Sequence, residues 1–212
     1  MAKNVGLVFV AAFAFSLFGC ATVQTFIGDR ADYVEFPIET RRRFIFDIDH
    51  VMGAYRMEDW GQGTSVFEGD NGRILRRGFS FHEGDLRLSR VELLQRETSG
   101  IIFSLVQRFV RFVDNSGRSV EYEVDFTPGV YLSIQDPAIG RIDFNYIMDG
   151  GRHTGFDVLV NGERFGILAL YPQPFRSGAL RPSFFLRRGN ELSRDMAMYI
   201  LAAHLSQQIR LN

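Results

Sequence analysis

Hydrophobic and polar side chains alternate along residues 119–127. Serine, glutamate and aspartate fill the positions between the apolar ones, which are Val120, Tyr122, Val124 and Phe126. Because successive side chains of a β-strand point to opposite faces of a sheet, this period of two predicts a strand with one face in the core and the other in water.

Two turn sequences join segments of this kind into hairpins. The apolar run at residues 101–113 is separated from the alternating segment by Asp114-Asn115-Ser116-Gly117, residue types that suit a tight reversal. Farther along, alternating residues flank Asn161-Gly162, a pair that readily takes the positive φ values of a type I′ turn. Both patterns predict antiparallel hairpins.

Shorter segments of the same kind recur, separated by glycine, aspartate and asparagine. We predict further strands at residues 33–38, 43–48, 65–68, 73–81, 86–94, 141–148 and 183–187. Many short strands with regular turns are typical of an antiparallel β-sandwich or a barrel-like sheet. The sequence therefore predicts a mainly β fold and leaves these two architectures open.

The pattern changes near the C-terminus. Residues 190–210 contain neither glycine nor proline and are rich in helix formers, which predicts one C-terminal α-helix. Asn190 or Ser193 could cap its first turn. Because apolar residues occur on both sides of this helix, we expect it to be broadly buried, across a sheet, at a barrel mouth or in self-association. Residues 33–212 are expected to form a single domain.

The composition excludes several classes of function. The formal net charge is −1 and arginine is interspersed with acidic residues, so no basic field is available to gather nucleic acid. Lysine occurs only at Lys3 and cysteine only at Cys20, which removes a lysine Schiff base and, if Cys20 is modified, a cysteine nucleophile. No two of the four histidines have the spacing of metal ligands on a helix, so we expect neither a metal nor another cofactor.

The N-terminus has the pattern of a secretory signal. One lysine precedes an apolar stretch at residues 5–18, which is shorter than the roughly 20 residues that a membrane-spanning helix needs. The stretch closes with Leu17-Phe18-Gly19-Cys20, which resembles the lipobox of bacterial lipoproteins, where the cysteine is diacylated and becomes the mature N-terminus. The resemblance implies a signal peptide at residues 1–19 and a lipidated tether at residues 20–32.

This resemblance also implies a location. Lipid on Cys20 would hold the protein on a membrane of the cell envelope, since two acyl chains suffice for stable anchoring. Ala21 stands where the family's inner-membrane retention signal would place aspartate, so the resemblance favours the outer membrane, facing the periplasm or the surface. The expected partners are that membrane and either another envelope protein or an apolar ligand.

Three places in the chain are candidates for chemistry or binding. Asp47, Asp49 and His50 could put a base or ligand at the end of a strand, although we favour a structural interpretation in which both carboxylates face solvent. His153, with Asp157 close by, lies in a glycine-rich segment that we interpret first as a hairpin turn. Trp60, the only tryptophan, also lies among glycines and could border a pocket or pack at the base of the fold.

These observations leave three hypotheses for function. The leading one is a non-enzymatic envelope lipoprotein that binds or scaffolds another envelope component. The second is a carrier of an apolar ligand, because a phenylalanine-rich antiparallel barrel with a C-terminal helix resembles a lipocalin in architecture, although the Gly-x-Trp signature is missing and the predicted strands exceed eight. The third is an envelope hydrolase that uses Asp47, Asp49 and His50, or His153 and Asp157.

Overall fold

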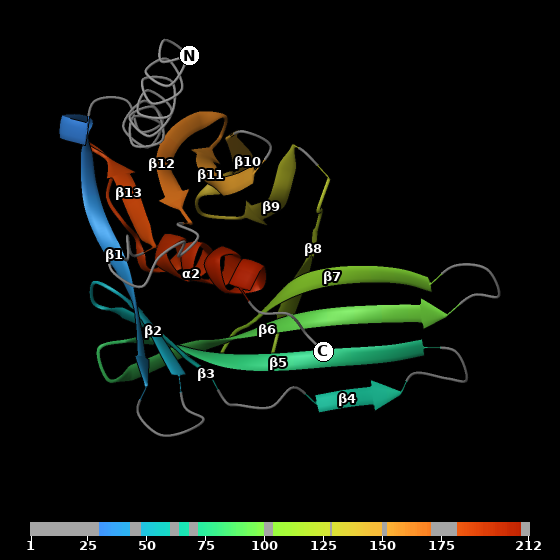
Figure 1. The fold of residues 1–212 in the computed structure, drawn as a ribbon. Coiled ribbons are helices and arrows are strands. Elements are labelled where there is room, and N and C mark those ends of the chain that lie inside the picture. Colours follow the sequence, from blue (N-terminus) through green and yellow to red (C-terminus); the bar gives the residue numbers. More distant parts are fainter. Residues whose placement is uncertain are drawn as a thin grey trace, which may run out of the picture.

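The computed structural model describes residues 30–42, 48–59, 64–67, 72–99, 104–127, 129–149, 152–170 and 182–208. This part of the chain is mainly β, as predicted, with one short 3₁₀ helix and one α-helix (Figure 1). The elements are η1 (Arg30–Asp32), β1 (Tyr33–Arg42), β2 (Ile48–Met52), β3 (Tyr55–Asp59), β4 (Thr64–Phe67), β5 (Gly72–Glu83), β6 (Leu86–Ser99), β7 (Ser104–Val113), β8 (Ser119–Val124), β9 (Val130–Asp136), β10 (Gly140–Asp149), β11 (Arg152–Val160), β12 (Glu163–Ala169), β13 (Ser183–Arg187) and α2 (Arg194–Gln208).

The strands close into an antiparallel barrel. Their order is β3-β2-β1-β13-β12-β11-β10-β9-β8-β7-β6-β5, and β3 pairs with β5 to complete a ring of twelve strands. The closing pairs run from Tyr55↔Glu83 to Asp59↔Phe79. Strand β4 lies outside this ring and pairs with the first half of β5. Of the two architectures that the sequence left open, the structure has the barrel.

Both predicted hairpins are present. Strands β7 and β8 are joined by residues 114–118, where the carboxylate of Asp114 accepts hydrogen bonds from the backbone amides of Ser116 and Arg118. Strands β11 and β12 are joined by Asn161 and Gly162, with φ values of 51° and 85°, as a type I′ turn requires.

Two regions of the barrel were not predicted. Within β2 the neighbouring residues Asp49 and His50 are both buried, so this strand does not alternate. Strand β3 has only five residues, and one of its buried positions is the charged residue Asp59. Strand β9 alternates between buried and exposed residues only after the consecutive buried pair Tyr131 and Leu132. A period-two pattern predicts a strand only where polar residues mark one face. Most of the strand predicted at residues 43–48 lies outside the described residues.

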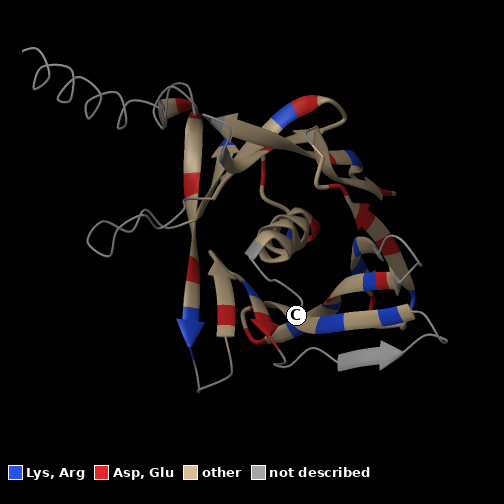
Figure 2. Ribbon diagram, turned by 45° about the vertical axis from the view of Figure 1, so that its right-hand side comes forward, with Lys and Arg blue, Asp and Glu red and all other residues tan. Residues whose placement is uncertain are grey.

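Helix α2 runs inside the barrel, surrounded by the ring of strands (Figure 2). The hydroxyl of Ser193 caps it by accepting a hydrogen bond from the amide of Met196 at 3.3 Å. Every residue from Met196 to Ser206 is buried, on all sides of the helix. A helix that is apolar all round belongs in a core, and here it forms that core together with the inward-facing residues of the wall.

The helix occupies the lumen, so the barrel is filled rather than hollow along α2. Large aromatic side chains complete the filling, which accounts for much of the phenylalanine in the sequence; the fully buried ones include Phe79, Phe81, Phe144, Phe156 and Phe184. The barrel end at which α2 begins is called the front mouth below. It is formed by the β7–β8 turn, the β9–β10 turn and the first turns of α2.

Candidate functional site: a pocket at the front mouth

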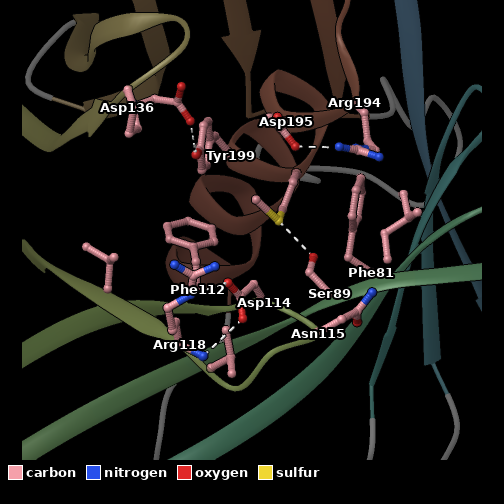
Figure 3. A pocket seen from close by; sticks show the side chains of 15 residues that line it. Phe81, Ser89, Phe112, Asp114, Asn115, Arg118, Asp136, Arg194, Asp195 and Tyr199 are labelled. Atoms are coloured by element: carbon pink, nitrogen blue, oxygen red, sulfur yellow. Dashed lines mark hydrogen bonds and ion pairs between the residues drawn. The ribbon is translucent and has the colours of Figure 1, made fainter.

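A pocket of about 670 Å³ opens at the front mouth, between the start of α2 and the barrel wall (Figure 3). This volume lies within the usual range for small-molecule sites, roughly 300–1,000 Å³. Its wall comes from several strands and from the helix; the lining residues are Phe81, Leu88, Ser89, Phe112, Val113, Asp114, Asn115, Arg118, Val120, Asp136, Pro137, Arg194, Asp195, Met198 and Tyr199.

The inner part of the pocket is apolar and aromatic. The ring of Phe112 on β7 meets the ring of Tyr199 edge to face, with centroids 4.9 Å apart. The hydroxyl of Ser89 on β6 donates a hydrogen bond to Sδ of Met198 on α2, with 3.1 Å between the two atoms. These contacts fix the helix against β6 and β7, so the pocket is bounded by packed elements and is preformed.

Charged side chains form the outer rim. Arg118 lies 3.5 Å from the carboxylate of Asp114, within the β7–β8 turn. Arg194 lies 3.4 Å from the carboxylate of Asp195, at the start of α2. The four side chains are between 44% and 87% exposed, so each pair contributes little to stability but places polar groups around an apolar interior.

Asp136 differs from the rim carboxylates because it is buried, with 8% of its surface exposed. Its Oδ1 accepts hydrogen bonds from the amides of Ala138 and Ile139 at 2.8 Å, and its Oδ2 accepts one from the hydroxyl of Tyr199 at 2.6 Å. Burial by itself would raise the pKa of Asp136, but these three hydrogen bonds outweigh it and hold the pKa below its usual value. The carboxylate is therefore ionised at neutral pH.

Tyr199 links Asp136 to helix α2 through this hydrogen bond. Burial and the neighbouring carboxylate raise the pKa of this phenol, so it stays protonated and acts as a donor. The hydrogen bond joins the second turn of α2 to the end of β9 and forms part of the pocket wall (Figure 3).

The structure separates the predicted residues Asp49 and His50. They are neighbours on β2, so their side chains point to opposite faces of the wall. Asp49 is buried and lies 4.0 Å from Nε of Arg56, which overturns the expectation that it faces solvent. On the outer face of the β2–β3 hairpin, the side chain of Arg56 covers the carboxylate of Asp49 and shields it from water. The alternation of residue types along the strand could not predict this contact. Asp47, Trp60 and Cys20 lie outside the described residues.

His50 points into the lumen and meets His204 of α2, with ring centroids 5.8 Å apart. Burial, opposed by the charge of Asp59 and reinforced by that of Arg77, lowers the pKa of His50 to about 4. Burial and the neighbouring His50 lower the pKa of His204 to about 3. Neither ring nitrogen of His204 has a hydrogen-bond partner among the described residues. This pair is neutral at physiological pH and lies away from the pocket lining.

His153 and Asp157 have separate partners as well. Nε2 of His153 donates to the carbonyl of Gly155 at 2.8 Å, and its ring packs against Tyr146. Asp157 forms a bidentate ion pair with Arg164 of β12. Since neither residue lines the pocket, the structure does not bring a predicted histidine and carboxylate together in a concave site.

Sequence reasoning missed the pocket residues themselves. They come from five strands, two turns and one helix, and no single segment carries a motif for them. The signal that was available is the Asp136-Pro137 dipeptide, which marks a turn, but nothing in the sequence places that turn beside Tyr199.

Two features are absent from the described parts of the chain. In the parts of the chain that the structure describes, no group of three or more His, Cys, Asp or Glu side chains is arranged to hold a metal ion. Over the same parts, no helix has the length and apolar character needed to cross a membrane. In comparisons with known proteins, no family model, no curated protein and no solved structure matches this chain.

Proposed function

We propose that this protein is a cell-envelope lipoprotein, held by lipid on Cys20, whose barrel binds a small amphipathic molecule in the front-mouth pocket. The observation that carries the proposal is the pocket itself, which combines an apolar interior with a polar rim in a volume of about 670 Å³. An apolar wall supplies binding free energy, and a few placed polar groups orient the ligand.

The filled lumen refines the carrier hypothesis. A carrier of the lipocalin kind would hold its ligand in the centre of the barrel, where α2 lies in this protein. The ligand would instead sit above the first turns of α2, in contact with Phe112 and Met198 and open to solvent on one side. The proposal therefore narrows the leading expectation, a binding or scaffolding role, to the binding of a small molecule.

Binding can be tested with the neutral apolar dye 1-N-phenylnaphthylamine, whose fluorescence rises in apolar surroundings. The full chain would be placed in phosphatidylcholine nanodiscs, with empty nanodiscs giving the partition background. Val120 is a half-exposed residue of the pocket rim, and in the variant Val120→Trp the larger side chain would fill the opening of the pocket. We expect saturable binding by the unmodified chain and a loss of at least about tenfold in affinity in this variant.

The matched control is Val106→Trp. Val106 lies on β7, is as exposed as Val120 (50% against 54%) and does not line the pocket. Equal dye binding by the unmodified chain and Val106→Trp, with weaker binding by Val120→Trp, would support the site. Absence of saturable binding, or an equal loss in both variants, would reject it.

The anchor needs a test of its own. Intact mass spectrometry of protein extracted from its native membrane should give a mature chain that begins at Cys20 and carries fatty acyl groups. Replacement in Cys20→Ala should abolish both cleavage and acylation. An unmodified, uncleaved chain from native membranes would contradict the lipoprotein part of the proposal and leave the binding part standing.

A further inference from the structure

The charges around the pocket do not balance. Three carboxylates line it, those of Asp114, Asp136 and Asp195, but only two guanidinium groups do, those of Arg118 and Arg194. Each guanidinium is already paired with a rim carboxylate, as described above. The unmatched negative charge is that of Asp136.

Asp136 has no cationic partner among the described residues, although it is the most buried of the three carboxylates. Its hydrogen bonds come from a phenol and two backbone amides, which are neutral donors. A carboxylate has about four lone-pair directions, so three bonds leave roughly one acceptor position on Oδ2. The free position lies on the atom that also accepts from Tyr199 at the pocket wall (Figure 3).

An unpaired carboxylate selects between ligands by charge. An apolar ligand that covers Asp136 removes its remaining water, and a buried charge without a counter-ion is costly. An anionic head group would add like-charge repulsion in a partly desolvated site. An ammonium group would supply both the missing positive charge and a donor for Oδ2.

The N-terminus of α2 also lies at this mouth and favours negative charge. That preference is already met by Asp195 in the first turn and by the ionised Asp136 itself, which is held by Tyr199 of the second turn. The positive end of the helix therefore stabilises the protein's own carboxylates, and the amide of Met196 in its first turn already donates to Ser193.

We infer that the ligand of the front-mouth pocket is a cationic amphiphile, an apolar body with an amine-type head group that pairs with Asp136. This inference rests on the proposed function and adds the chemical class of the ligand. The apolar body contacts Phe112 and Met198, and the ammonium group donates to Oδ2 of Asp136.

Two probes with the same fluorophore test the inference. Dansylcadaverine ends in a primary ammonium group, and dansyl-6-aminohexanoic acid ends in a carboxylate on a chain of nearly the same length. Titrated at neutral pH into the full chain in phosphatidylcholine nanodiscs, the ammonium probe should bind at least about tenfold more tightly than the carboxylate probe.

The variant Asp136→Asn removes the charge and keeps the oxygen that accepts from the backbone amides. It should reduce the preference for the ammonium probe to within about twofold. Asp125→Asn is the matched control, because Asp125 also caps a turn, by accepting from the amide and hydroxyl of Thr127, and lies at the other end of β9. This control should keep the full preference.

The outcomes separate the inference from the proposed function. Equal binding of the two probes, or tighter binding of the carboxylate probe, would overturn the inference while 1-N-phenylnaphthylamine binding stayed intact. A preference that persists in Asp136→Asn would also overturn it, because the selectivity would then arise elsewhere. Loss of all probe binding, including that of the neutral dye, would reject the pocket as a binding site.

Discussion

The hydroxyl of Tyr199 donates a 2.6 Å hydrogen bond to Oδ2 of Asp136. The two residues are far apart in sequence, one on the helix inside the barrel and the other at the end of β9. Their contact fixes the depth at which α2 enters the barrel and sets one side of the front-mouth pocket. The position of the helix and the shape of the site are therefore determined together.

A double-mutant cycle should reveal this coupling. Tyr199→Phe removes the donor and Asp136→Asn removes the charge of the acceptor, so the two changes should be non-additive by about 1–2 kcal/mol in the free energy of unfolding. Urea denaturation of the four proteins gives the value. Tyr131→Phe, which removes a hydroxyl that pairs with Ser206 instead, should be additive with Asp136→Asn. Additivity in both cycles would mean that the observed contact contributes nothing to stability.

The buried histidine pair predicts a loss of stability in acid. The folded-state pKa values of His50 and His204, about 4 and about 3, lie below the ordinary value of 6.5, so the unfolded chain binds more protons between these limits. The contribution of these two neutral histidines to the free energy of unfolding is fully present above pH 6.5 and is lost as the pH falls toward 4 for His50 and toward 3 for His204. For His204 alone the loss by pH 4 is on the order of 3 kcal/mol.

The variant His204→Leu should flatten this dependence. It removes one of the two protonation sites and also a buried imidazole without hydrogen-bond partners, so stability at pH 7 should be unchanged or higher. Urea denaturation at several pH values from 7 to 4 would measure both effects. An unchanged slope would show that the pair is not what makes the fold sensitive to acid.

Gly140 begins β10 in a conformation that excludes other residues. Its φ is +100°, and an added Cβ would lie 2.8 Å from Nδ2 of Asn161, whose side chain bonds the backbone of Arg141 and Ile139. Gly140→Ala should therefore destabilise the fold by about 2–3 kcal/mol, through backbone strain and lost hydrogen bonds. Gly189→Ala, at φ +93° with open space around it, should show the strain alone and cost about half as much. Similar thermal shifts in both variants would refute the steric part.

Glu92 on the outer face of β6 is fully buried beneath arginines. Arg76 lies 2.6 Å from Oε1 and Arg111 lies 3.2 Å from Oε2, and Arg90 also contacts Oε1. Glu92→Gln leaves these cations without their shared counter-charge and should cost about 3 kcal/mol. Glu121→Gln, at a half-buried partner of Arg111, should cost less than about 1 kcal/mol in the same denaturation assay. Equal losses would argue against burial as the cause.

Alternation predicted the elements whose two faces differ. It located β8 and the β11–β12 hairpin because their inward positions are apolar and their outward positions are wet. A different signal predicted α2, namely a long segment without glycine or proline, and the broad apolar surface of this segment correctly indicated deep burial. Alternation placed Asp49 in water because Arg56 covers that carboxylate on the outer face, where the pattern assumes solvent. It missed β9 because that strand begins with three consecutive apolar residues, Val130, Tyr131 and Leu132.

The candidate site was less accessible to sequence reasoning. The pocket depends on how far α2 enters the barrel and on which turns meet there, and these are long-range relationships. Asp136 and Tyr199 illustrate the difficulty, since each alone is an ordinary turn aspartate or core tyrosine. Asp49, His50 and His153 stood out as residue types, but the structure gives each a separate set of partners.

The most direct test of the central claim is a chemical-shift map of the backbone amides during titration with 1-N-phenylnaphthylamine. We expect shifts clustered at the front mouth, at Ser89, Asn115 and Met198, and no shifts at the other end of the barrel, at Asp125 and Tyr146. Shifts clustered at the other end, or no saturable shifts at all, would contradict the assignment of a binding site to this pocket.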